Sequence, residues 1–314
     1  MRICFVFNPH SGRNRGRPGL ATAIREFIAA RSLDARLAVT EGPGHATALA
    51  REAVHAGAEV VVAVGGDGTM NEVAQGLVNT SAALALVPCG SGNGLALHLG
   101  LPRSPLAALE LATGAGGRIA AVDTGTANGR PFFNAMGLGF DADVSQRFNR
   151  LTRRGLPAYA RVAFGALREI RPERCRITCG ARTEELEVLL VAVANSDQYG
   201  NNARIAPGAR VDDGRLDLVA IRPVGLVSAA LLVPRLFFGN LDRSPHVFRL
   251  SGPTFTIDRV SPRLIHTDGE THAATASVKV VVQPRSLRII IPHVSRAVAA
   301  LERPAVVRFA LQFP

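Results

Sequence analysis

The chain has 314 residues, 47% of them hydrophobic, which is enough to bury a full core and excludes an intrinsically disordered protein. Its formal net charge is +11, and Lys279 is the only lysine. P-loop proteins and protein kinases both place a lysine on the phosphates, so both classes are excluded. Any phosphate must be met by glycine amides, helix N-termini, arginine or metal.

The first part of the chain alternates apolar strands with amphipathic helices. Continuous apolar runs favour strands that are buried on both faces, and apolar residues spaced by three and four are typical of helices. We expect strands at 2–9, 35–42, 59–66 and 82–94, the last running into a glycine turn, and helices at 19–33, 45–57 and 69–79. This order predicts a doubly wound, parallel α/β domain.

After about Ile119, short strands follow one another with only turns between them. We expect these strands at 120–129, 130–139, 175–180, 186–196, 214–223, 246–252, 254–259, 263–270, 277–284 and 286–292. The pattern predicts an antiparallel, sandwich-like or barrel-like second domain, interrupted by a helical stretch at 144–170. We therefore expect one domain over 1–121 and another over 122–296. The docking of the last segment, 297–314, on the first domain stays open.

Three glycine-rich turns follow strands of the first domain. They are NPHSGRNRG at 8–16, GGDGTMNE at 65–72 and PCGSGNG at 88–94. In a doubly wound sheet all three lie at the carboxyl ends of strands, where such folds bind ligands. Each also precedes an expected helix whose free N–H groups favour anions. Ordinary tight loops seldom carry so many glycines, so the turns predict a phosphate-binding rim.

Asp67 is unexpected in such a rim, because a carboxylate repels phosphate. It either holds backbone amides of the loop, or acts through a metal or a substrate hydroxyl, and the sequence leaves these alternatives open. Thr69 and Glu72 have the spacing of a capping box, with Thr69 as the N-cap of the helix.

These blocks, with three more from the second half, resemble those of the diacylglycerol kinase catalytic-domain family of lipid kinases, which includes sphingosine kinases and bacterial lipid kinases. The later blocks are FFNAMGLGFDADV, RIAPGARVDDGRLDLV and HTDGE. The six occur in order over almost the whole chain. The resemblance implies a phosphofructokinase-like α/β domain that binds ATP, a β-sandwich domain that contacts lipid, and an active site in the cleft between them.

The resemblance also implies which residues form the nucleotide site. They are Asn8, Ser11, Thr40, Gly65, Gly66, Asp67, Gly68, Thr69, Asn71, Ser91 and Asn93. The family places an acid at the position of Glu270 as the base that takes the proton from the lipid hydroxyl. Asp67 has that role in sphingosine kinases, so both stay candidates, with Glu270 first.

Metal and substrate contacts are implied in the second domain. A structural Mg²⁺ site would use the side chain of Asp213 and backbone oxygens of Arg210 and Arg215. Asp141 or Asp143 would contact the lipid head group.

Each of these acids also has a plainer interpretation. Asp-Gly at 268–269 and at 213–214 is a hairpin signal in its own right, and the acids in 141–144 fit a solvated strand edge. The Arg-rich stretch 147–168 is either a solvated helical face or a contact with an anionic membrane.

The sequence therefore predicts a lipid kinase that transfers the γ-phosphate of ATP to a hydroxyl of a diacylglycerol, a sphingoid base or a related lipid, with Mg²⁺. A soluble kinase of the NAD-kinase type and a non-catalytic nucleotide-binding protein are the alternatives. We expect a lipid partner at an anionic membrane surface and no nucleic acid, and a homodimer stays open. No apolar segment reaches the roughly 18 to 20 residues of a spanning helix, so we expect a cytoplasmic, peripheral protein. Gly94 stands where many bacterial diacylglycerol kinases carry an aspartate, which weakens a specific claim for diacylglycerol.

Overall fold

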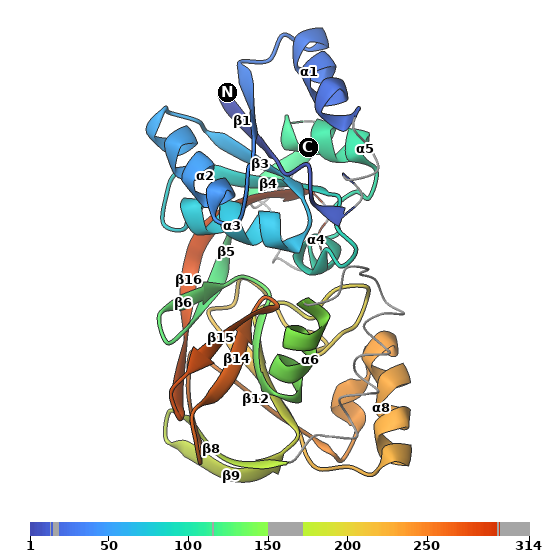
Figure 1. Ribbon diagram of the computed structural model, residues 1–314, viewed down its shortest axis with the longest axis vertical. Helices are drawn as coiled ribbons and strands as arrows, with labels where there is room; N and C mark the ends of the chain where they lie inside the picture. The colour runs from blue at the N-terminus through green and yellow to red at the C-terminus, as the bar shows by residue number, and fades with distance from the viewer. Residues whose placement is uncertain (13, 15–18, 115, 150–171, 294, 296–314) are drawn as a thin grey trace, which may run out of the picture.

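A computed structural model describes residues 1–12, 14, 19–114, 116–149, 172–293 and 295. The expected segment 297–314 and most of the helical stretch 144–170 lie outside the described residues. The chain forms two parts arranged along the long axis of the molecule, with the N-terminal part at the top of Figure 1.

The first part forms one end of the larger of two β-sheets. Its four strands are parallel and lie in the order β2–β1–β3–β4. The strands span Ile3–Phe7 (β1), Ala35–Val39 (β2), Val60–Gly65 (β3) and Ala83–Pro88 (β4). The helices span Leu20–Ala30 (α1), His45–His55 (α2), Asp67–Leu77 (α3), Gly94–His98 (α4) and Pro105–Ala112 (α5). The expected parallel α/β class is confirmed.

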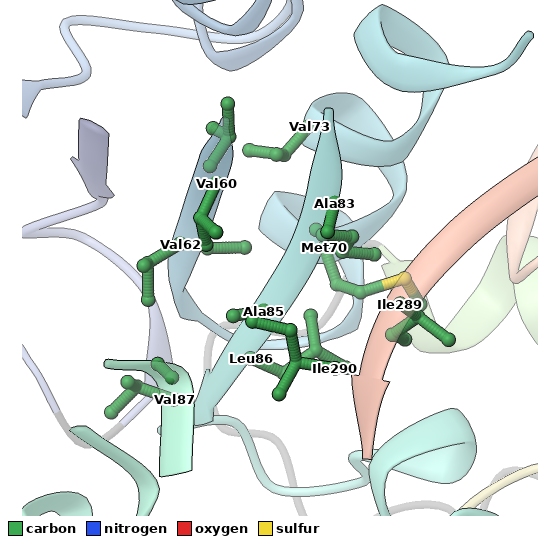
Figure 2. Packing of buried hydrophobic residues seen from close by; sticks show 14 of the residues in the cluster. Val60, Val62, Met70, Val73, Ala83, Ala85, Leu86, Val87, Ile289 and Ile290 are labelled. Carbon is green, nitrogen blue, oxygen red and sulfur yellow. The ribbon is translucent and has the colours of Figure 1, made fainter. Parts of the chain in front are cut away.

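The core of this part forms where the sheet meets its helices (Figure 2). Val60 and Val62 of β3 and Val73 of α3 are buried in one apolar cluster, together with Ile289 from near the end of the chain. Small and β-branched side chains dominate this cluster, since the chain has no tryptophan and few aromatic residues. The packed sheet fixes the strand ends from which the glycine turns emerge.

The second part is a sandwich. A six-stranded, wholly antiparallel sheet in the order β12–β11–β10–β7–β14–β15 faces strands β16, β13, β8 and β9 of the larger sheet. The strands of the smaller sheet span Val247–Gly252 (β12), Leu216–Ile221 (β11), Leu190–Ala194 (β10), Ala135–Gly139 (β7), Arg263–Thr267 (β14) and Glu270–Ala274 (β15). Those of the larger sheet span Gly117–Ala127 (β5), Arg130–Phe132 (β6), Glu173–Cys179 (β8), Arg182–Val188 (β9), Thr254–Arg259 (β13) and Ser277–Pro292 (β16). Met136 and Leu138 of β7 point into the space between the sheets, as period-two alternation requires.

One long strand joins the two parts, where two strands were expected. Residues 277–284 and 286–292 form the single strand β16, with an irregularity in its pairing with β5 at 283–287, where Arg285 has a φ of +50°. Its first half pairs with β13 and its second half with β4. The larger sheet therefore runs through both parts, and the division expected at 121 falls inside β5 and stays a prediction.

Two other expected strands are each split. The run 186–196 becomes β9 and β10, which belong to different sheets, with Leu189 between them. The run 130–139 becomes β6 and β7, because the intervening amides of Phe133 and Asn134 donate hydrogen bonds to a side chain, Asp268, and not to a neighbouring strand.

Helices α5, α6 and α8 were missed or misplaced in the predictions from the sequence. The interpretation of 141–144 as a strand edge is wrong: α6 spans Phe140–Asn149, and Asp141 and Asp143 lie in its first turn, where acids complement the helix dipole. A further helix, α8, spans Leu226–Phe238 with Pro234 inside it. In the described part of the chain, no helix is long and apolar enough to cross a bilayer.

Candidate active site

Three glycine turns from the ends of β1, β3 and β4 meet at one edge of the sheet, as expected. A Cβ atom on Gly90 would lie 2.7 Å from the Cα of Gly66, and one on Gly12 would lie 2.5 Å from the carbonyl oxygen of Cys89. Ser11 Oγ accepts a 2.6 Å hydrogen bond from the Gly66 amide. Because real Cβ atoms do not approach so closely, glycine is required where these turns cross.

Asp67 holds the third turn. Its Oδ2 accepts a 2.8 Å hydrogen bond from the Asn93 amide, and its Oδ1 accepts one of 2.8 Å from the Gly94 amide. Burial raises the pKa of Asp67, and these two hydrogen bonds act in the opposite direction. Of the roles left open by the sequence, the geometry shows the first: the carboxylate binds loop amides with both of its oxygens.

Asn93 completes the turn from its own side chain. It has a φ of +52° and is the N-cap residue of α4. Its Oδ1 accepts from the Gly90 amide at 3.0 Å, and its Nδ2 donates to the Gly90 carbonyl oxygen at 2.9 Å. The turn is therefore fixed at both ends before any ligand arrives.

The remaining residues expected at the nucleotide lie around this rim with different exposure. Asn8 Nδ2 donates to Thr69 Oγ1 at 3.0 Å, which ties β1 to α3. Thr40 is buried at the end of β2, and its amide donates to the Phe7 carbonyl oxygen at 2.9 Å.

Four others lie on or near α3 and the third turn. Asn71 is buried, and its Oδ1 has no hydrogen-bond partner among the described residues. Gly68 and Ser91 are exposed, and Gly65 is buried with Thr69 packed against its Cα.

The expected capping box is wrong. Gly66, not Thr69, is the N-cap residue of α3, and no side chain caps this helix end. Glu72 Oε2 accepts a 3.0 Å hydrogen bond from the Ala46 amide, so Glu72 caps the neighbouring helix α2. The N-terminal amides of α3 therefore remain available to an anion.

Glu270 lies at the start of β15 in the second part, within electrostatic range of Glu72 on α3. The Asp-Gly signal before it does form a hairpin, since Asp268 and Gly269 both have positive φ, +49° and +86°, and Thr267 pairs with Glu270. Burial raises the pKa of Glu270, and the negative charge of Glu72 raises it further. The Glu270 carboxyl is thus within electrostatic range of the helix that starts at the second glycine turn.

The sequence predicted Asp268 only as a turn residue. It did not predict that the Asp268 carboxylate also binds distant backbone amides. Its carboxylate accepts hydrogen bonds from the amides of Phe133, Asn134 and Ala135 at 2.7, 2.8 and 2.9 Å. These bonds fix the hairpin that carries Glu270 to the segment between β6 and β7. No local pattern signals such a contact, because the partners are more than 130 residues apart.

The two acids expected at the lipid head group have different surroundings. Asp141 is buried, accepts a short hydrogen bond from the Tyr199 hydroxyl, and lies 2.9 Å from His266 Nε2. Asp143 lines a cavity of about 270 Å³ with Arg263, Leu264 and Gly139. Asp143 is therefore the more accessible of the pair.

The segment expected to hold metal gathers negative charge. Asp213 Oδ1 accepts from the Arg215 amide at 3.0 Å, and Arg210 pairs with Asp212 at 3.0 Å. Burial raises the pKa of Asp213, as do the negative charges of Asp217, Asp123 and Asp212.

A metal here would need backbone oxygens. Within the described ranges, no group of three or more His, Cys, Asp or Glu side chains is placed to hold a metal ion. Asp123 does not supply a free carboxylate, because it accepts from the amides of Gly214 and Arg285 at 2.7 and 2.8 Å. The accumulated charge around Asp213 is the feature of this segment that fits a cation.

A polar contact joins the third turn to the second part. His98, at the end of α4, lies with Nδ1 2.6 Å from Asp197 Oδ1, and the Asn201 amide donates to the Gly92 carbonyl oxygen at 3.2 Å. Although burial raises it, the pKa of Asp197 is held below its ordinary value by His98 and by Arg204. This contact was not predicted from the sequence, where the polar run that follows β10 is its one local signal.

We expect Gly90→Ala to lower the free energy of unfolding of the ligand-free protein by about 1–3 kcal/mol, because the new Cβ would overlap the Gly66 backbone. Gly68→Ala is the matched control: nothing lies within 4 Å of its Cβ position, so it should be neutral or slightly stabilising. Urea unfolding of both variants measures the difference. Equal stability of the two would contradict the close crossing of the turns.

Comparison with known proteins identifies two domains in the chain. Residues 2–127 match the model of the diacylglycerol kinase catalytic domain, and residues 134–291 match that of the YegS C-terminal NAD kinase beta sandwich-like domain. A Pseudomonas aeruginosa (strain UCBPP-PA14) protein named "Probable lipid kinase YegS-like" is 32% identical over 93% of this chain and 94% of its own. The Bacillus subtilis protein named "Diacylglycerol kinase" is 27% identical over 86% of this chain and 89% of its own.

A solved structure shares the fold. The crystal structure of a diacylglycerol kinase from Bacillus anthracis strain Sterne superimposes with a TM-score of 0.75 at 23% identity, covering 92% of this chain and 96% of that one. The two domain models together span almost the whole chain in the order of the two structural parts. The chain therefore belongs to the diacylglycerol kinase family and is a lipid kinase.

Proposed function

We propose that this lipid kinase uses ATP as its phosphate donor and transfers the γ-phosphate to a hydroxyl of a diacylglycerol or a related lipid alcohol. The observation that carries the proposal is the pairing of two features from different parts of the chain. A rim of crossed glycine turns ends at the uncapped start of α3, and Glu270 from the second part is close enough to Glu72 of that helix for their charges to interact.

The rim suits a triphosphate because its donors are amides in fixed positions. The approach of Gly66 to Gly90 leaves no room for side chains, so a ligand there meets backbone. The uncapped N-terminal amides of α3 add the positive end of a helix dipole. This arrangement supplies the phosphate contacts that the chain cannot obtain from lysine.

Glu270 is the better candidate for the base. Both oxygens of Asp67 accept loop amides, whereas no hydrogen bond from another described residue occupies the Glu270 carboxylate. A base is most effective when its pKa lies near the working pH, and the raised pKa of Glu270 moves it in that direction. In the proposed reaction Glu270 takes the proton of the lipid hydroxyl while the hydroxyl oxygen bonds to the γ-phosphorus, and the bond from that phosphorus to the β–γ bridging oxygen breaks, so that ADP leaves.

Mg²⁺ would neutralise charge on the phosphates when bound. We propose that a second, structural Mg²⁺ site uses the side chain of Asp213 and backbone oxygens of Arg210 and Arg215. The support is the negative charge that Asp123, Asp212 and Asp217 add around Asp213, which a cation would offset.

The lipid head group has a candidate position beside α6. The cavity is lined by the carboxylate of Asp143, the positively charged guanidinium of Arg263 and the apolar side chain of Leu264. Relatives carry the names diacylglycerol kinase and lipid kinase, which favours a glycerolipid, while Gly94 keeps sphingoid bases within the proposal. We place the reaction at the cytoplasmic face of an anionic membrane, in keeping with the net charge of +11.

The description of the second domain as NAD kinase-like favours one other candidate, a kinase that phosphorylates NAD. Incubation with Mg-ATP and either NAD or mixed diacylglycerol and sphingoid lipids separates the two. Phosphate transfer to NAD alone would replace the lipid proposal. Binding of ATP with no acceptor consumed would favour a non-catalytic protein.

Removing the base tests the proposed chemistry. We expect Glu270→Gln to lower kcat for lipid phosphorylation by about 10²–10⁴ while the Kd for ATP stays unchanged, because the amide cannot take a proton. Transfer from radiolabelled ATP to lipid, with Glu184→Gln on β9 as a control, measures the effect. Full activity of Glu270→Gln would rule out Glu270 as the base.

The pH dependence carries a second test. The base must be ionised, and its pKa is raised, so activity should fall on acidification at a higher pH than for an ordinary glutamate. Glu72→Gln removes a nearby negative charge but keeps an acceptor for the Ala46 amide. We expect this variant to shift the acidic limb of kcat/KM to lower pH, and an unmoved or upward-shifted limb would contradict the interaction.

A further inference from the structure

Helix α8 presents an apolar face to solvent. Val227, Leu231 and Phe238 are 77%, 64% and 79% exposed, and Val233 is 56% exposed. These are large apolar side chains, and few others in the described chain are exposed to this extent. Contiguous apolar surface of this kind marks a site of contact with another molecule or a membrane.

Four of the exposed residues form a single face because of their spacing, whereas Val233 lies off it. Val227, Leu231, Pro234 and Phe238 recur at intervals of three and four residues, which places them along one side of the helix. The opposite side holds the helix to the protein: Leu232 is buried and Leu236 packs with it against the outer surface of the smaller sheet. The helix is thus anchored on one side and apolar on the other.

Basic residues flank this face. Arg222 precedes the helix and is exposed, Arg235 lies in its last turn, and Arg243 follows and is exposed. The helix itself contains no acidic residue, and Asp242 is the only acid between 222 and 243. An apolar stripe with arginines at its ends matches the boundary of a membrane whose surface is negatively charged.

We propose that α8 is the surface by which the protein binds an anionic lipid bilayer. Val227, Leu231 and Phe238 would enter the boundary between head groups and acyl chains, and Arg222, Arg235 and Arg243 would meet lipid phosphates. This proposal rests on the proposed function in that the membrane is also the source of the substrate. It names a different element from the Arg-rich stretch 147–168, most of which lies outside the described residues.

The position of α8 relates the membrane to the candidate head-group site. Leu232 and Leu236 of α8 and Phe140 at the start of α6 belong to one apolar cluster on the outer face of the smaller sheet. Asp143, in the first turn of α6, lines the cavity described above. Figure 1 shows α8 on the outside of the second part, far from α5 in the first part. Lipid held at α8 is therefore on the same face of the sheet as the helix that carries Asp143.

Vesicle flotation of the full chain tests the proposal. We expect binding to vesicles of phosphatidylcholine with phosphatidylglycerol, weaker binding to phosphatidylcholine alone, and a loss of binding as salt rises. The double variant L231Q/F238Q should bind the mixed vesicles about tenfold less tightly, because two apolar side chains are lost from the contact. Leu106→Gln on α5, where Leu106 is 57% exposed, is the matched control and should bind as the unmodified protein does.

Two outcomes would overturn the proposal: flotation of L231Q/F238Q equal to that of the unmodified protein, or no flotation of the unmodified protein. A dimer that dissociates in L231Q/F238Q with vesicle binding unchanged would assign the face to a second copy of the chain instead. Phosphorylation of dihexanoylglycerol, a water-soluble substrate, judges the proposed function separately. We expect L231Q/F238Q to retain that activity. If the unmodified protein phosphorylates no lipid but L231Q/F238Q still binds vesicles less than the unmodified protein does, the proposed function is wrong and the assignment of α8 as the membrane-binding surface is retained.

Discussion

The fold of the candidate site depends on how the Asp67 carboxylate is bound. A carboxylate beside a phosphate site would repel the ligand if its charge were free. Here both oxygens accept backbone amides, from Asn93 and Gly94, in the turn that follows the next strand. The negative charge of Asp67 thereby orders the third glycine turn, at 88–94. The N-terminal amides of α3, which no side chain caps, remain for a ligand. These two hydrogen bonds join the same two turns whose backbones cross at Gly66 and Gly90.

The same interaction recurs at two other junctions of the chain. Asp268 binds the amides of residues 133–135, and Asp123 binds those of Gly214 and Arg285. In each case a carboxylate fixes a segment distant in sequence, where no regular strand pairing is available. Hydrogen bonds to charged groups contribute about 1.5–3 kcal/mol each, more than ordinary ones. The hairpin that carries Glu270 is one of the segments positioned in this way.

Local patterns were sufficient for much of the fold. The strand β3 and the helix α3 follow from an apolar run and a glycine turn, and the hairpin before Glu270 follows from Asp-Gly. The errors arose where a distant partner decided the outcome. Glu72 has the spacing to cap its own helix, yet it bonds to Ala46 of α2. Strand β16 passes through a residue of positive φ, Arg285, because strands on both sides continue to pair with it.

The candidate site, like the fold, was predictable from the sequence only where its features are local. The glycine turns and Asp67 could be found because they are local, whereas the contacts of Asp141 with Tyr199 and His266 could not, because they join α6 to residues far along the chain. The face of α8 was also hidden, since a run of apolar residues does not reveal which side is covered. Tertiary packing, and not composition, determines both features.

The most direct test of this account is amide hydrogen exchange in Asp67→Asn, combined with ATP binding. If Asp67 holds the third turn, exchange at Asn93 and Gly94 should accelerate by roughly 10- to 100-fold, as the loss of a hydrogen bond to a charged group implies, and the Kd for ATP should rise. If Asp67 instead acts only in the chemical step, exchange and ATP affinity would match the unmodified protein while kcat alone fell. That second result would contradict the assignment of Asp67 to the turn and of Glu270 to the chemistry.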